Sequence, residues 1–288
     1  MKDLKDKVAV ITGGAGGIGY AFAQRAVEEG MKVVLSDIRE ESLAAAEEKL
    51  KALGGDVCCV QTDVRDPEQV EQLAQKAVET FGKVNLIFNN AGVFATGLAW
   101  ETSIEEYQWA IETNLYSVIY GIKAFVPRMI QQGDECHVIN IASAAGLSPT
   151  VGFCMYSTTK AAVVALTESL YLDLLTHQIS NIGVTLVMPG FVQSDVMNPE
   201  KVAPSQDIAD ELPARLDDPI FNQIEMMMRA GVTDGMPAAA AAELVFNAIK
   251  NNDLYVLPNA EPSLPAAKAV ADGRIGAVNV FPEMYGMG

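Results

Sequence analysis

The sequence predicts an α/β protein: a doubly wound parallel sheet, with helices on both faces, in a single domain. Short runs rich in β-branched residues alternate along the chain with longer segments of helical pattern. Such alternation is typical of parallel strands joined by crossover helices. The short runs are apolar at nearly every position, as expected for strands covered on both faces. No repeat or shift of composition marks a boundary, so residues 1–288 are expected to form one domain.

The expected elements follow from the runs themselves. Apolar runs predict strands, at 8–12, 32–37, 56–61, 84–90, 137–143 and 183–190. Segments of helical pattern lie between them, at 18–29, 40–53, 67–82 and 156–175. Pro67 opens its helix at the position that proline favours. Thr102 and Glu105 have the spacing of a capping box before a further long helix.

Composition narrows the function classes. Lys and Arg number 20 against 37 Asp and Glu, which gives a formal net charge of −17. Such a surface repels nucleic acid and anionic membranes, so we expect neither as a partner. The N-terminus lacks a signal-peptide profile and no stretch approaches a membrane span, which favours a cytoplasmic location. The four cysteines form no CxxC pair, so we expect reduced thiols and no metal site.

A glycine-rich loop, "TGGAGGIG" at Thr12–Gly19, follows the first expected strand and opens the first expected helix. Glycines let the backbone approach a pyrophosphate closely, and a helix N-terminus offers free N–H groups to the anion. The loop fits both G-x-G-x-x-G and T-G-x-x-x-G-x-G. A glycine match alone also fits an ordinary turn, but a strand, a helix and a downstream acid occur here in order, which favours nucleotide binding.

The downstream acid is Asp37, at the end of the second expected strand. A carboxylate there can accept both ribose hydroxyls of an adenosine, and it repels a 2′-phosphate. This favours NAD over NADP. Arg39 lies two residues on and could offset the aspartate, and Asp37 could instead cap the next helix.

The stretch "YSTTK" puts Tyr156 and Lys160 four residues apart, at the start of an apolar helix. Positions four apart share one helical face, roughly 5–6 Å between Cβ atoms. The pair is either a phenol tuned by an ammonium or two ordinary residues that share a helix. The spacing alone does not decide between these interpretations.

Together the motifs resemble the short-chain dehydrogenase/reductase family, over about residues 5–258. The resemblance is carried by the glycine loop, by YSTTK, and by a series of shorter motifs: Asp63 in "TDV", "NNAG" at 89–92, Asn114 in "ETNLYS", Ser143 in "NIASAAG" and "PGFVQS" at 189–194. It implies a Rossmann-type fold with NAD across the carboxyl edge of the sheet. It also selects the T-G-x-x-x-G-x-G reading of the glycine loop.

The resemblance implies NAD contacts from the glycine loop, from strand ends and from the YSTTK helix: Gly13, Gly16, Gly17, Ile18, Gly19, Asp37, Asp63, Val64, Asn90, Tyr156, Lys160, Pro189, Gly190, Val192 and Ser194. Asp63 and Val64 would flank the adenine, and Asn90 would lie near the adenosine ribose. Many relatives have threonine where this chain has Ser194, which keeps the hydroxyl and loses a methyl group.

The catalytic set that the resemblance implies is Asn114, Ser143, Tyr156 and Lys160. A free tyrosine has a pKa of about 10, which is high for a base near neutrality. Lowering that pKa by about three units needs roughly 4 kcal/mol, which Lys160 and the pyridinium ring of NAD⁺ together could supply. Tyr156 would be the base in oxidation and the acid in reduction. Ser143 would hydrogen-bond the substrate oxygen, and Asn114 would anchor a water beside Lys160.

These residues predict an NAD-dependent oxidoreductase that interconverts a secondary alcohol and a ketone. An NADPH-preferring carbonyl reductase and a non-enzymatic NAD-binding protein are the alternatives. The resemblance implies that the irregular segment at 191–237 is the substrate loop, and its apolar residues favour aryl, steroid-like or aliphatic substrates. The residues expected in the apolar lining of the site are Phe191, Met197, Met226–Met228, Ala144, Leu147 and Phe153.

Two further expectations concern assembly. The helix at 156–175 is apolar around most of its circumference, which favours a homodimer or homotetramer. The tail at 259–288 is rich in Ala, Pro and Gly, and it fits either a subunit-contact arm or a loose end.

Overall fold

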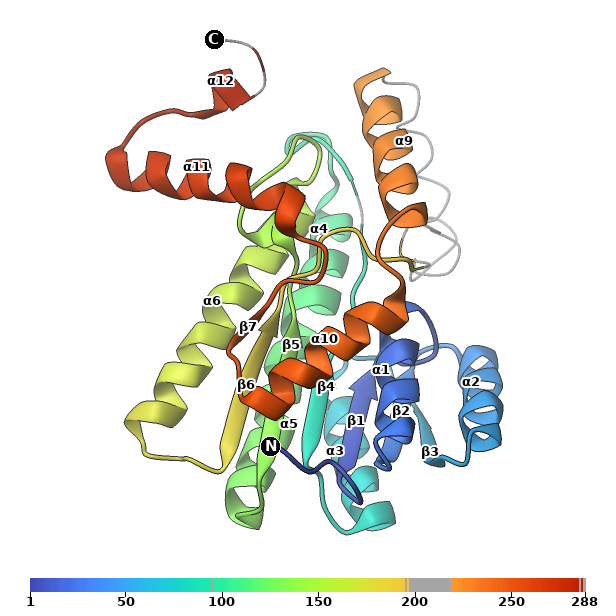
Figure 1. The fold of residues 1–288 in the computed structure, drawn as a ribbon. Coiled ribbons are helices and arrows are strands. Elements are labelled where there is room, and N and C mark those ends of the chain that lie inside the picture. Colours follow the sequence, from blue (N-terminus) through green and yellow to red (C-terminus); the bar gives the residue numbers. More distant parts are fainter. Residues whose placement is uncertain (95, 195, 197–218, 285, 287–288) are drawn as a thin grey trace.

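The protein is described by a computed structural model that covers residues 1–94, 96–194, 196, 219–284 and 286. Its centre is a seven-stranded sheet in the order β3-β2-β1-β4-β5-β6-β7, with every pairing parallel (Figure 1). The strands are β1 (Val8–Thr12), β2 (Lys32–Asp37), β3 (Asp56–Gln61), β4 (Leu86–Asn89), β5 (Cys136–Ile141), β6 (Ile182–Val187) and β7 (Tyr255–Val256). The order reverses between β1 and β4, which is where ligands bind in doubly wound sheets.

Helices cover both faces of this sheet. They are α1 (Gly17–Glu28), α2 (Glu40–Ala52), α3 (Pro67–Phe81), α4 (Ile104–Ile111), α5 (Ser117–Gln132), α6 (Cys154–Thr176), α9 (Pro219–Thr233), α10 (Ala238–Asn251), α11 (Leu264–Gly276) and α12 (Phe281–Met284). Residues of α1, α2 and α10 share one apolar core with the sheet, and residues of α3, α5 and α6 share another. The predicted α/β class and doubly wound topology are confirmed.

The α1 and α10 face is held by aromatic packing. Phe88 of β4 lies between Phe22 of α1 and Phe246 of α10, with ring centroids 5.1 and 5.7 Å apart. All three side chains are fully buried. Burying an aromatic side chain stabilises the fold by about 1.5–3 kcal/mol, so these three rings fix the glycine-loop helix against the sheet.

On the other face, a buried chain of hydrogen bonds ties the sheet to α6. Asn89 donates to the Asn140 side chain (2.8 Å), and Asn140 donates to the Thr167 hydroxyl (3.0 Å). Gly121 of α5 packs so closely on Asn89 that a Cβ there would lie 2.0 Å from the Asn89 Oδ1. Because hydrogen bonds between buried amides favour one arrangement, this chain of bonds sets the position of α6 relative to β4 and β5.

The start of α4 differs from expectation by one residue. Ser103, not Thr102, is the N-cap, and it exchanges hydrogen bonds with Glu106 in a complete capping box. The Thr102 hydroxyl instead donates to the Leu98 carbonyl. The pairs Thr102–Glu105 and Ser103–Glu106 both have the capping-box spacing, so the spacing alone does not distinguish them. Within the described residues, no helix is long and apolar enough to cross a membrane, and no group of three potential metal ligands occurs.

Candidate active site

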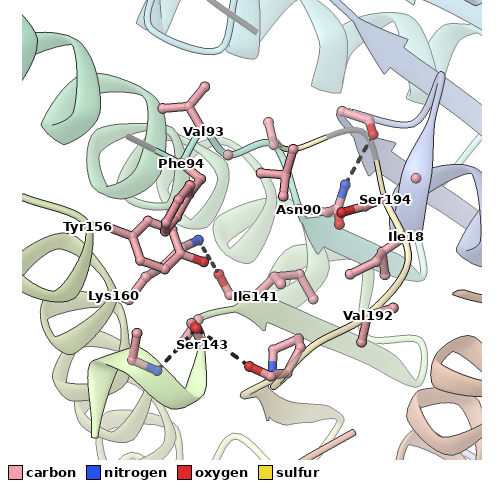
Figure 2. Close-up of a pocket in the computed structure, with 18 of the residues that line it drawn as sticks. Ile18, Asn90, Val93, Phe94, Ile141, Ser143, Tyr156, Lys160, Val192 and Ser194 are labelled. Carbon is pink, nitrogen blue, oxygen red and sulfur yellow. Dashed lines mark hydrogen bonds between the residues drawn. The ribbon is translucent and has the colours of Figure 1, made fainter. Parts of the chain in front are cut away.

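A crevice of about 660 Å³ runs along the carboxyl edge of the sheet. Sixteen of the predicted site residues line it: Gly13, Gly16, Gly17, Ile18, Gly19, Asp37, Asp63, Val64, Asn90, Ser143, Tyr156, Lys160, Pro189, Gly190, Val192 and Ser194. Figure 2 labels ten of the lining residues, which come from the start of α1, the segment around Asn90, the end of β5, the start of α6 and the loop after β6. Segments far apart in the sequence therefore meet at one site. Asn114 is the one predicted residue that lies behind the lining.

Glycines of the loop at 12–19 meet three kinds of constraint. Gly13 and Gly17 have φ of +60° and +52°, a region that favours glycine. A Cβ on Gly19 would lie 2.2 Å from the Gly13 carbonyl oxygen. At Gly16, the N-cap of α1, a Cβ would meet only the end of Arg39, at 3.9 Å. The loop therefore leaves open space at Gly16, directly before the free N–H groups of the first turn of α1.

Thr12 and Asn90 brace this loop. The Thr12 hydroxyl accepts the backbone N–H groups of Asn90 and Ala91, at 3.0 and 3.1 Å. The Asn90 amide donates to the carbonyls of Thr12 and Gly13. Asn90 was predicted to lie near the adenosine ribose. It does line the crevice, but its amide N–H groups are hydrogen-bonded to carbonyls of the glycine loop.

Asp37 is the last residue of β2, and its side chain is 8% exposed. One carboxylate oxygen accepts the N–H of Ala15 in the glycine loop, at 3.2 Å. The other accepts the Arg39 backbone N–H (3.2 Å) and its guanidinium (3.3 Å). Asp37 therefore joins β2 to the glycine loop, and Arg39 partly offsets its charge.

A second Asp-x-Arg pair stands at the end of β3. Arg65 binds the Asp63 carboxylate in a bidentate pair whose shortest distance is 2.6 Å. Burial raises the pKa of Asp63, but the hydrogen bonds and charge of Arg65 outweigh it and hold the pKa below its usual value. The Asp63 carboxylate is thus an anion that is already paired with Arg65.

The opposite end of the crevice holds Tyr156, Lys160 and Ser143 (Figure 2). Tyr156 lies in the first turn of α6 and Lys160 one turn on, so the helical spacing brings them to one side. Lys160 is buried, donates to the Ile141 carbonyl at 3.0 Å, and lies 5.7 Å from the centroid of the Tyr156 ring. Ser143 lies two residues after the end of β5, and its oxygen accepts the Ala145 N–H at 3.2 Å.

The causes that act on the Tyr156 pKa differ from the expectation that Lys160 helps to lower it. In the chain alone, burial raises this pKa, and the Ser143 hydroxyl, not Lys160, acts to lower it. The Ser143 hydroxyl oxygen lies 3.5 Å from the Pro189 carbonyl oxygen, so its single proton makes a hydrogen bond there that is at the limit of length. This proton is therefore free to turn toward the phenol. Burial lowers the pKa of Lys160 to about 8.

Asn114 lies in a short π-helix, Glu112–Tyr116, between α4 and α5. Single π-helical turns are frequent at functional sites. Its side chain is fully buried: Oδ1 accepts the Val93 N–H (2.7 Å), and Nδ2 donates to the Val93 carbonyl (2.9 Å) and to Thr159 (3.2 Å). Asn114 thereby fixes the segment after NNAG beside α6, and its expected role in holding a water stays a prediction.

Two aromatic side chains pack against Tyr156, and apolar side chains line much of the crevice. Phe94 and Phe153 meet the Tyr156 ring edge-on, with centroids 4.9 and 6.5 Å away. Of the expected apolar lining, Phe191, Ala144, Phe153, Met227 and Met228 line the crevice. Leu147 instead packs in the core beside α6, Met226 is mostly exposed, and Met197 lies outside the described residues.

Sequence reasoning missed several lining residues: Phe94, Trp109, Pro262, Ser263 and Ala266. Phe94 follows NNAG by two positions, so its proximity to the motif was the available signal. The last three belong to the tail, where no local pattern distinguishes a wall of the site from a loose end.

Lys160 is expected to destabilise the fold near neutrality. Its folded-state pKa of about 8 lies below the ordinary 10.5, so the cost of burying the ammonium is full below pH 8 and fades as the pH rises toward 10.5. Lys160→Met should raise the free energy of unfolding by up to about 3 kcal/mol at pH 7. The gain should shrink by pH 10. Urea unfolding at both pH values measures this, with exposed Lys123→Met as control; an equal gain at both pH values would contradict it.

Comparison with known proteins agrees with this geometry. A family model described as short chain dehydrogenase matches residues 7–204. The CLA biosynthesis dehydrogenase/reductase of Lactiplantibacillus plantarum is 34% identical over 261 residues, which cover 91% of each chain. The 1-deoxy-11-beta-hydroxypentalenate dehydrogenase of Streptomyces avermitilis is 30% identical over 260 residues, covering 90% of this chain and 86% of that one.

Among solved structures, a short chain dehydrogenase/reductase from Burkholderia phymatum in complex with NAD matches with a TM-score of 0.89 and 35% identity. The match covers 97% of this chain and 98% of that one. It therefore includes the tail as well as the sheet. The match of fold, motifs and length shows that this chain belongs to the short-chain dehydrogenase/reductase family of oxidoreductases.

Proposed function

We propose that this chain is an NAD-dependent enzyme that interconverts a secondary alcohol and a ketone by hydride transfer. The observation that carries the proposal is the convergence of Tyr156, Lys160 and Ser143 at one end of a crevice. The other end of the same crevice holds the glycine loop and Asp37. A proton-transfer group and a dinucleotide cradle thus face one space.

The residues present fit NAD. The open space at Gly16 and the N–H groups of α1 suit a pyrophosphate. The Asp37 carboxylate at the end of β2 suits the adenosine ribose, and the loop Pro189–Ser194 would hold the nicotinamide. The Burkholderia phymatum relative, solved in complex with NAD, supports this assignment.

The proposed chemistry divides the work between cofactor and chain. NAD⁺, when bound, supplies the acceptor for the hydride. Tyr156 takes the hydroxyl proton of the alcohol, and in reduction it returns that proton to the ketone oxygen. Ser143 donates a hydrogen bond to the same oxygen, where negative charge develops. The Lys160 ammonium lies 5.7 Å from the Tyr156 ring but does not lower the Tyr156 pKa in the chain alone, so the Ser143 hydroxyl, together with the pyridinium ring of bound NAD⁺, would favour the phenolate form.

The substrate is proposed to be apolar around its carbinol carbon. Within the described lining, the charged side chains are Asp37, Arg39, Asp63, Arg65 and Lys160. Apart from Lys160, these belong to the strand ends assigned to the adenosine. Phe94, Phe153 and Trp109 line the substrate end instead. The Streptomyces avermitilis relative is named for a hydroxylated substrate, which supports an alcohol as the substrate class.

Preference for NAD over NADP rests on Asp37. Its carboxylate is buried at the mouth of β2, whereas the Arg39 side chain is 37% exposed. A 2′-phosphate would meet the carboxylate first, and Arg39 would recover part of the repulsion. The pair therefore supports a preference for NAD and leaves NADP as the weaker cofactor.

A panel of secondary alcohols with NAD⁺ or NADP⁺ tests the proposal, with reduced cofactor followed by absorbance. We expect turnover with NAD⁺, and a kcat/KM that is lower by about tenfold or more with NADP⁺, since repulsion between like charges costs a few kcal/mol. Asp37→Ala should remove the preference, and Arg39→Gln should strengthen it. Turnover of no alcohol would refute the proposed reaction, and a preference for NADP⁺ would refute the cofactor assignment.

Association into a homodimer or homotetramer also stays a proposal, as does the cytoplasmic location. Leu172 and Leu175 on α6 are 57% and 62% exposed, which supports burial of this face in a second copy. Light scattering at micromolar concentration measures the mass that decides it.

A further inference from the structure

The chain that leaves β7 is fastened to the loop after β6. Gly190 donates its N–H to the Pro258 carbonyl (2.9 Å), and the Asn259 amide donates to the Phe191 carbonyl (2.6 Å). Backbone contact is so close that a Cβ on Gly190 would lie 2.0 Å from the Asn259 carbonyl oxygen. Ala260 is fully buried. The first residues of the tail are therefore a fixed part of the fold.

This attachment determines where α11 begins. The chain turns through a short 3₁₀ helix, Glu261–Ser263, and enters α11 at Leu264. Pro262, Ser263 and Ala266 then line the crevice, on the same side as Pro189 and Gly190. Figure 1 shows α11 and α9 both standing beyond the carboxyl edge of the sheet, on either side of the view.

The wall on the α9 side has a different chemistry. Met227, Met228 and Val232 of α9 line the crevice there. Methionine side chains are unbranched and adapt to irregular shapes. Proline and alanine have almost no side-chain freedom. The crevice thus has an adaptable wall on α9 and a rigid, small-residue wall at the start of α11.

We propose that the first turn of α11 is the fixed wall of the substrate pocket, and that Ala266 sets the size of the substituent that fits beside the carbinol carbon. The inference rests on the proposed function and adds a specificity-determining residue to it. A bulky group fits because residue 266 carries only a methyl group. The α9 wall adjusts around the same substrate, but the α11 wall, tied to the loop at 189–191, does not retreat.

Ala266→Phe tests the wall with two probe alcohols, butan-2-ol and 1-(2-naphthyl)ethanol, oxidised with NAD⁺. The added ring should lower kcat/KM for the naphthyl alcohol by about tenfold or more relative to butan-2-ol, as overpacking of a fixed site does. The Kd for NADH should change less than about twofold. The control is Ala271→Phe. Ala271 lies on the same helix but is exposed and does not line the crevice, so this change should alter neither the ratio of the two kcat/KM values nor the Kd for NADH.

An equal effect of Ala266→Phe on both alcohols, or no effect on either, would overturn the proposal. A separate readout does not depend on turnover: hydrogen–deuterium exchange of peptides that cover 259–270. Exchange there should be slow in the wild type, and Asn259→Ala should raise it about fivefold by removing one hydrogen bond. Fast exchange in the wild type would refute the fixed wall even if the enzyme oxidises alcohols. Failure of all alcohols with slow exchange would refute the proposed reaction instead.

Discussion

Replacing Tyr156 by phenylalanine is expected to lower kcat by about 10³-fold or more, because general acid–base catalysis contributes roughly 10²–10⁴-fold and this phenol is the proposed proton carrier. The ring itself should stay in place. Phe94 and Phe153 contact it edge-on, and these contacts need only the aromatic ring. Affinity for NADH should therefore remain within about twofold, so that the loss falls on the chemical step.

The matched control for this change is Tyr107→Phe. This change also removes one tyrosine hydroxyl, which contacts the Cys154 thiol at 3.1 Å. Tyr107, however, does not line the crevice. Steady-state kinetics on both variants, with NADH binding followed by fluorescence, separate a lost proton carrier from a lost packing contact. Turnover of Tyr156→Phe near the wild-type rate would remove Tyr156 from the proposed mechanism.

The pH dependence gives the same prediction a second readout. Because burial raises the pKa of Tyr156 in the chain alone, the phenolate is scarce at neutral pH. Alcohol oxidation should then speed up as the pH rises, with ketone reduction favoured at lower pH. A flat profile for oxidation, under conditions where chemistry limits the rate, would mean that another group carries the proton.

Local patterns predicted most of the fold and of the candidate site. The glycine loop, the strand ends and YSTTK each combine a short spacing with a fixed element, so Asp37, Tyr156 and Lys160 fall where the spacing requires. The attachment of Asn259 to Phe191 joins residues 68 apart in the sequence, and no periodicity encodes it. The pKa of Tyr156 was equally out of reach, since the spacing gives its neighbour Lys160 but not the depth of burial.

The role of Asp37 shows the same limit within a correctly predicted residue. Its place at the end of β2 follows from the strand pattern. Its partners, the Ala15 N–H and Arg39, depend on how the glycine loop folds back over the strand. Sequence therefore identified the residue that we propose selects the cofactor, and the structure shows that the charge beside it is that of Arg39.

The second large effect is expected in the glycine loop, where two similar substitutions should separate binding from folding. At Gly16 the backbone is extended, with φ of −159°, and an added Cβ would meet only Arg39, at 3.9 Å. Gly16→Ala should therefore fold with a free energy of unfolding within about 0.5 kcal/mol of the wild type. Its methyl group, however, would fill the space proposed for the pyrophosphate. Overpacking of about 1–3 kcal/mol corresponds to roughly 5- to 150-fold weaker binding of NADH.

Gly19→Ala should behave differently. Its Cβ would lie 2.2 Å from the Gly13 carbonyl oxygen and 2.5 Å from the Asn90 amide nitrogen, so the loop must shift to admit it. We expect a loss of stability of about 1–3 kcal/mol together with weaker NADH binding. Gly276→Ala, where a Cβ meets only an ordinary contact at 3.7 Å, is the control for both measurements. Urea unfolding and NADH fluorescence titration on the three variants decide the matter: wild-type affinity in Gly16→Ala would show that the open space beside α1 is not where the dinucleotide binds.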